Sequence, residues 1–198
     1  MTKSPVTLGI LLFGATMLIF FVVYWFFSGI TYFETSMIVN AFILPVLYAG
    51  TAFWSVKSRW NNHRLGFKEA FKRAFVPMFV GGFLSVASIF VFLNFVDTDA
   101  KKLLNYQFVQ TNKKKLDDTY KAEKSRLISE KDIKELEEDY QKNLQSFNDN
   151  QVKGKDMLTA SHFSGYFAAI LIFYLVLSLF FGAFFRTRTM HEEIINQE

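Results

Sequence analysis

The sequence predicts an all-α integral membrane protein: four transmembrane helices with an extracytoplasmic helical hairpin between spans three and four. The first observation is a set of four stretches without a single Asp, Glu, Lys, Arg or His, namely residues 7–27, 37–56, 74–96 and 163–185. Each approaches the roughly 20 residues that a helix needs to cross a hydrocarbon core of about 30 Å. The second is residues 97–162, which are polar but rich in helix formers, with no proline and one glycine.

The first apolar stretch is interpreted as a retained span. Lys3 precedes it, as a basic residue precedes a signal peptide, but the stretch is longer than the usual hydrophobic region of about 7 to 15 residues and no clear A-x-A site follows. A buried helix of a soluble protein normally shows a polar face, which all four stretches lack. We therefore expect all four to lie in the membrane.

The orientation follows from the distribution of the basic residues. Residues 57–73 carry six Lys and Arg against one Glu, whereas residues 97–162 balance thirteen basic against thirteen acidic side chains. Short loops rich in Lys and Arg stay in the cytoplasm during insertion. The loop between spans two and three is therefore expected inside, together with both termini, and residues 97–162 are expected outside.

The end of this basic loop carries two stripes at four-residue spacing, which predict an amphipathic helix. The aromatic stripe is Phe67, Phe71 and Phe75, and the cationic stripe is Arg64, Lys68 and Lys72. Such a helix can lie in the membrane interface before Pro77 redirects the chain into span three. Two interpretations stay open: the cations only set the topology, or they form a site for anionic lipid or a partner.

The polar segment predicts two helices that fold back on each other. Ser129 is a candidate N-cap, and an apolar stripe follows at spacings of three and four, consisting of Ile133, Leu136, Tyr140, Leu144 and Phe147. A weaker stripe precedes it, made of Leu104, Phe108, Leu116, Tyr120 and Leu127. Span three is expected to continue outward as a helix and to turn back near Ile128. The stripes serve either each other or a partner protein.

The sequence offers no constellation of residues for chemistry. The four spans lack the titratable groups that mark proton or ion paths, and the chain has no cysteine. His63, His162 and His191 are far apart, and no phosphate-binding loop, G-x-S-x-G or H-E-x-x-H motif occurs. We expect no catalytic, cofactor-binding or metal-binding residues. Small residues four apart, Gly81 with Ser85 and Ser178 with Gly182, indicate close helix packing instead.

Three segments together resemble a known family. The segment HRLGFKEAFKRAF (63–75) precedes a span that contains glycine, VFLNFVDTD (91–99) closes that span, and a charged helical insertion with ISEKDIKELEE (128–138) precedes the last span. This arrangement resembles the small inner-membrane proteins of Bacteroidota catalogued as domain of unknown function 4199, or DUF4199. Thr98 stands where that family has a proline. The resemblance implies a four-helix protein of the bacterial inner (cytoplasmic) membrane and brings no activity.

The expected organisation is therefore three spans with a basic cytoplasmic loop in 1–96, an outer charged segment in 97–162, and the last span with a short tail in 163–198. The first functional hypothesis is a non-enzymatic accessory or scaffold protein of an envelope complex. The alternative is a transporter or lipid-handling protein with an uncharged path between helices. The expected partners are membrane lipids, including anionic ones, and other membrane or envelope subunits. No nucleic acid is expected, because the excess charge is confined to one short loop.

Overall fold

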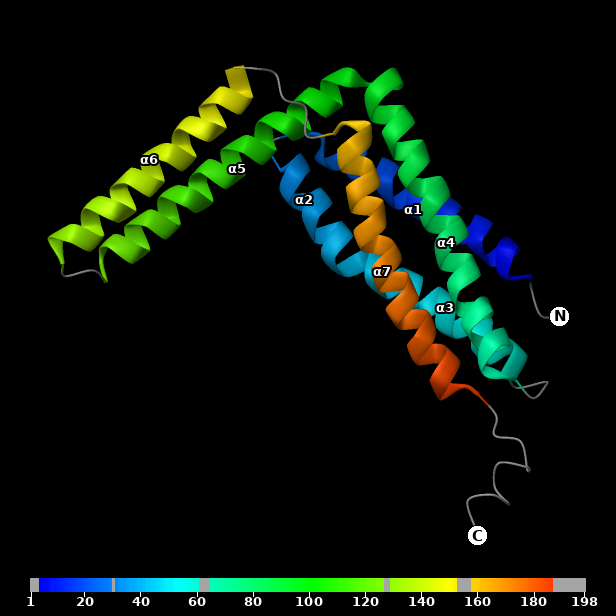
Figure 1. Cartoon of the computed structure of the whole chain (residues 1–198). Coiled ribbons are helices and arrows are strands. Elements are labelled where there is room, and N and C mark those ends of the chain that lie inside the picture. Colours follow the sequence, from blue (N-terminus) through cyan, green and yellow to red (C-terminus); the bar gives the residue numbers. More distant parts are fainter. Residues whose placement is uncertain (1–3, 30, 61–64, 127–128, 153–157, 187–198) are drawn as a thin grey trace, which may run out of the picture. The chain divides into compact units, whose positions relative to one another are not determined.

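In the computed structural model every described regular element is a helix, and the chain forms two units (Figure 1). One unit comprises Met1–Phe92 with Ala160–Glu198, and the other comprises Leu93–Thr159. The structure describes residues 4–29, 31–60, 65–126, 129–152 and 158–186, with the backbone alone for 149–152. The all-α prediction is confirmed.

The four predicted spans lie in the first unit, except that the end of the third span, Leu93–Val96, falls in the second. They are α1 (Pro5–Phe27), α2 (Tyr32–Ile38) joined through the π-helical turn η1 (Val39–Ile43) to α3 (Leu44–Trp60), α4 (Phe67–Val91) extended by the π-helical turn η2 (Phe92–Val96), and α7 (Ala160–Phe184). Within the described part of the chain, these four are long and apolar enough to cross a membrane. Pro5 suits the first turn of α1, where its missing N–H is not needed.

The second span begins earlier than predicted. The helix starts at Tyr32, five residues before the apolar stretch 37–56, and the Thr35 amide donates to the Thr31 carbonyl at 2.9 Å. Tyr32 is only 1 % exposed, and its ring lies 6.5 Å from that of Tyr24 on α1. Burying this side chain against α1 accounts for the early start, which the count of apolar residues did not reveal.

The helix α4 packs against α1, α3 and α7. It runs parallel to α1: a Cβ on Gly9 would lie 2.8 Å from the Cβ of Val80, and further along both helices the Phe20 and Phe92 rings are 5.5 Å apart. Parallel first and third spans are what consecutive crossings of a membrane require.

The last span α7 runs antiparallel to α4. The Phe163 and Phe90 rings are 5.2 Å apart near the start of α7, and Gly182 near its end faces Phe67 at the start of α4. The end of α3 lies at the same level, where the Trp60 ring is 5.8 Å from that of Phe185. The beginnings of α1 and α4 and the ends of α3 and α7 thus share one end of the four-span unit, as alternating spans predict.

Small residues let these helices approach closely, as the sequence predicted. A Cβ on Gly81 would lie 3.0 Å from the Gly9 carbonyl oxygen of α1. Ser85 and Ser178 are 3 % and 0 % exposed, and a Cβ on Gly182 would lie 3.0 Å from the Phe67 ring. Close backbone approach of this kind increases dispersion contacts where apolar lipid offers no hydrophobic drive.

The second unit is an antiparallel hairpin of α5 (Thr98–Lys124) and α6 (Glu130–Val152). Lys113 on α5 donates to Asn148 on α6 at 2.7 Å, and Lys124 at the end of α5 lies 3.8 Å from Glu137 near the start of α6. The α6 helix begins where predicted, with the Ile133 amide donating to the Ser129 carbonyl at 3.1 Å. Leu127 and Ile128, where the turn was predicted, lie outside the described residues.

The prediction that span three continues into the hairpin as one helix was wrong, because the helix is interrupted at Asp97. Asp97 ends the apolar helix and starts α5 as an N-cap, with its Oδ1 accepting from the amides of Asp99 at 3.1 Å and Ala100 at 2.9 Å. Such a cap satisfies amides that lack partners in the first turn. The expectation overlooked that an aspartate directly after an apolar run is itself a start signal.

The separate interfacial helix expected before Pro77 is also absent, since α4 runs from Phe67 to Val91 with Pro77 inside it. Pro77 is buried, and its carbonyl oxygen lies 3.1 Å from where a Cβ on Gly9 would be. The amphipathic residues 67–75 are therefore the first turns of the third span.

Candidate functional site

The predicted partner or hairpin face lies on one side of α6. The residues of this face are all half-buried, and the residues between them are exposed. The half-buried residues are Ile133, Leu136, Tyr140, Leu144 and Phe147. Leu116 and Tyr120 of α5 are half-buried as well, and the Tyr120 and Tyr140 rings stack with centroids 4.4 Å apart. The structure therefore brings the two predicted stripes together as a seam, called the hairpin seam below.

Polar groups fasten this seam near its middle. The Tyr140 hydroxyl donates a short hydrogen bond to Asp117, and this bond raises the pKa of Tyr140 because it holds the phenol in its neutral form. Lys124 donates to the Tyr120 hydroxyl at 2.8 Å. That bond, followed by the charge of Glu137, raises the pKa of Lys124. The two arms are thus held in register by paired polar groups as well as by apolar contact.

The predicted interfacial residues have two different surroundings in the structure. Phe67, Phe71 and Phe75 form a stacked ladder with centroid distances of 6.3 and 5.8 Å, while Lys68 and Lys72 are exposed. The ladder continues through Phe79 and Phe83, at 5.6 and 6.2 Å. Phe67 and Phe71 face Gly182 of α7, so this end of the ladder packs against another helix of the bundle. Arg64 lies outside the described residues.

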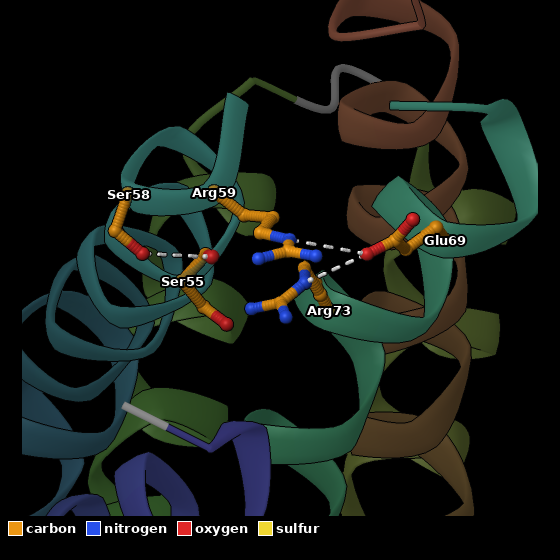
Figure 2. A network of polar contacts seen from close by, with 5 residues as sticks. All are labelled: Ser55, Ser58, Arg59, Glu69 and Arg73. Carbon is orange, nitrogen blue, oxygen red and sulfur yellow. Dashed lines mark hydrogen bonds and ion pairs between the residues drawn. The ribbon is translucent and has the colours of Figure 1, made fainter. Parts of the chain in front are cut away.

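Sequence reasoning missed a charged cluster between the end of α3 and the start of α4 (Figure 2). Glu69 Oε1 lies 3.6 Å from Arg59 Nε and 3.4 Å from Arg73 Nε. The side chain of Arg73 is only 16 % exposed and that of Arg59 32 % exposed, against 47 % for Glu69. In the sequence these residues only contributed to the net charge of the loop. The four-residue spacing of Glu69 and Arg73 was the one signal that indicated an ion pair.

A group of buried hydroxyls lies inside the four-span unit. The Thr16 and Tyr48 hydroxyls are 3.2 Å apart, and Tyr48 donates to Ser85 at 3.5 Å. Thr16 also donates to the Leu12 carbonyl at 2.8 Å, and the Tyr48 ring stacks on that of Tyr174 at 5.4 Å. Three helices contribute to this uncharged cluster, whose hydroxyls satisfy one another and the backbone.

Within the described ranges, no three His, Asp or Glu side chains gather as a metal site requires. His162 is exposed on the first turn of α7. His63 and His191 lie outside the described residues.

Comparison with known proteins gives one match. The family model described as "Protein of unknown function (DUF4199)" matches residues 7–187, which include all four spans and the hairpin. No curated protein and no solved structure matches the chain.

Proposed function

Because the chain belongs to the DUF4199 family, whose description names no activity, we propose a function from its own structure: a non-enzymatic accessory or scaffold protein of an envelope complex in the bacterial inner membrane. In this proposal the four spans anchor the chain, and the hairpin of α5 and α6 holds a partner protein outside the cytoplasm.

The observation that carries the proposal is the incomplete burial of the hairpin seam. Among the described residues of α5 and α6, only Ala100 is buried; the seam side chains, including Leu136 and Leu144, keep part of their apolar surface in contact with solvent. Two helices cannot enclose an apolar core, because each seam residue has neighbours on one side only. A third element laid along one edge of the seam would cover that surface, and we propose that a partner supplies it.

The proposed orientation has both termini in the cytoplasm and the hairpin outside. The exposed Lys57, Lys68 and Lys72 lie where α3 ends and α4 begins, at the end of the four-span unit that also holds the start of α1 and the end of α7. Cations retained at one end agree with the charge bias that directs insertion.

The alternative of a transporter with an uncharged path has weaker support. The buried hydroxyls of Thr16, Tyr48 and Ser85 are the groups that would line such a path, but they bond to one another and to backbone carbonyls. Bonded in this way, they stabilise the helix packing and need no passing solute.

Photo-crosslinking in native membranes tests the scaffold function at three consecutive exposed residues of α6, Gln141, Lys142 and Asn143. At about 100° per residue, Gln141 and Asn143 flank the hairpin seam on its two edges, and Lys142 points away from it. A crosslinker at one of the two edges should capture a single protein in good yield, and the same group at Lys142 should not.

The captured protein, carrying its own crosslinker, should in turn capture this hairpin. Adducts of equal yield at all three positions, or adducts at none of them, would contradict the scaffold function.

A further inference from the structure

Three hydrogen-bond donors converge beside the charged cluster without an acceptor. Ser55 Oγ, Arg59 Nε and Arg73 Nη1 are buried atoms, and none has a hydrogen-bond partner among the described residues. Arg59 Nε is 3.6 Å from Glu69 Oε1, which is close enough for an ion pair but long for a hydrogen bond. Buried donors are normally paired, so three in one place indicate a missing acceptor.

Ser55 differs from three other hydroxyl residues of the spans. Thr51, Ser85 and Ser178 each donate to the backbone carbonyl four residues earlier, at 2.9, 2.7 and 2.6 Å. That bond is the usual way to satisfy a hydroxyl on an apolar helix. Ser55 is 0 % exposed, yet its hydroxyl makes no such bond. Its hydroxyl therefore lacks an acceptor among the described residues, on the side where the guanidinium groups lie (Figure 2).

The charges around Ser55 do not balance. Arg59 and Arg73 share one carboxylate, that of Glu69, so the cluster carries one net positive charge in a largely covered position. Glu69 Oε1 lies 3.6 Å from Arg59 Nε and 3.4 Å from Arg73 Nε, while Arg73 Nη1 is buried without a hydrogen-bond partner among the described residues. Figure 2 shows the two guanidinium groups side by side between α3 and Glu69, with the side chain of Ser55 turned toward the same space.

We propose that Ser55, Arg59 and Arg73 bind a phosphate group. Two planar guanidinium forks and one hydroxyl offer donors to several oxygens of a tetrahedral anion, and one bound negative charge would neutralise the excess. The site lies between the end of one candidate membrane span and the start of the next, and in the proposed orientation this is the end that faces the cytoplasmic head groups. The phosphate comes from a phospholipid head group or from free phosphate, and the site holds whether or not the hairpin recruits a partner.

This site is distinct from the cationic stripe. Lys68 and Lys72 are exposed on α4 and attract anions only through screened surface charge. Arg73 follows Lys72 directly, and its side chain is largely covered. Substitutions of these two neighbours are therefore matched. Lys72→Gln and Arg73→Gln each remove one positive charge, the first outside the site and the second within it.

Native mass spectrometry of the full chain in maltoside micelles, which contain no phosphate, measures binding to phosphatidic acid, with diacylglycerol of the same chains as the control. The parent protein should retain the phosphate lipid and not the diacylglycerol. Arg73→Gln should weaken retention about tenfold or more, because a charge-assisted bond is lost. Lys72→Gln should change it by no more than about twofold, since an exposed charge is screened.

Free phosphate is tested by adding inorganic phosphate to the lipid-free protein and measuring its melting temperature. A rise in the parent protein that Arg73→Gln abolishes assigns the site to the free ion, whereas retention of phosphatidic acid without such a rise assigns it to a lipid. The proposal is overturned if neither probe binds, or if Lys72→Gln and Arg73→Gln weaken binding of the phosphate probe by the same factor.

Two milder variants separate binding from folding. Arg73→Lys keeps the charge but loses the planar fork, and Ser55→Ala removes only a hydroxyl without a described partner. Both should keep the parent's melting temperature without ligand and should bind the phosphate probe more weakly. A Ser55→Ala protein that melts lower and binds equally well would mean that the hydroxyl serves the fold, against the proposal.

Discussion

Substitution of Gly82 by alanine should destabilise the four-span unit, because the site has no room for a methyl group. A Cβ on Gly82 would lie 2.5 Å from the Tyr174 hydroxyl oxygen and 2.8 Å from its Cε2. Both distances are shorter than carbon contacts allow. The Tyr174 ring is 4 % exposed and stacks on Tyr48 at 5.4 Å, so it cannot swing away without disturbing the core cluster.

The expected cost of Gly82→Ala is about 1–3 kcal/mol, the usual range for forcing extra atoms into a packed interior. Gly14 of α1 is the matched control, because a Cβ there meets nothing within 4 Å. Both substitutions change the backbone entropy of a helix in the same way, so the difference between them isolates the steric term. Gly14→Ala should be neutral or slightly stabilising.

The assay is unfolding of the full chain in mixed micelles with a denaturing detergent, followed by tryptophan fluorescence. Tyr174→Phe removes the nearest clashing atom, so the double variant Gly82→Ala/Tyr174→Phe should be more stable than the sum of the two single effects predicts. Equal stability of the Gly82→Ala and Gly14→Ala proteins, or strict additivity with Tyr174→Phe, would refute the close approach of α4 and α7.

Three further predictions concern the hairpin and the orientation. Leu136→Asp should cost about 1–3 kcal/mol of local stability by placing a charge in the hairpin seam, seen as faster amide exchange in α5 and α6 but not in α1; unchanged exchange would mean that the seam does not hold the arms together. A periplasmic reporter should be active when fused near Asn150 and inactive near Asn62, and the reverse pattern would invert the topology. The pKa values of Tyr140 and Lys124 are raised in the folded hairpin, so their stabilisation is complete below their unfolded values of about 10 and is lost as pH rises further. The free energy of unfolding of the hairpin, measured by denaturation of the full chain with circular dichroism, should therefore fall above about pH 10, less so in Tyr140→Phe, and a value that does not change with pH would exclude this contribution.

The spans and the hairpin were predictable because their signals are local in the sequence. Uncharged runs of membrane length and apolar residues at spacings of three and four report helices directly, and both kinds of signal led to the observed elements. The starts of helices were less predictable where a tertiary contact decides them. Tyr32 begins a helix because it packs against Tyr24, a contact that no local pattern announces.

The charged cluster could not be predicted, because it depends on which charges turn inward. In the sequence, Arg59 and Arg73 add to a basic loop in the same way as Lys68 and Lys72 do. In the structure the two arginines meet across the end of α3 and the start of α4, while the lysines stay exposed. Helical spacing places Arg73 near Glu69, but only the packing of α3 on α4 brings Arg59 to the same carboxylate.

The two proposed roles of these arginines, in setting the topology and in binding phosphate, do not compete, since they would act at different times. Charge bias directs insertion while the segments are still separate helices, so every Lys and Arg of residues 57–73 contributes then, whatever its later position. Once α3 and α4 pack, Arg59 and Arg73 are partly withdrawn from water, and a withdrawn charge needs a counter-ion. Glu69 supplies one negative charge for two positive ones. The remaining charge and the unpaired hydroxyl of Ser55 are therefore a consequence of the folded bundle, and they are the features that a bound phosphate would satisfy.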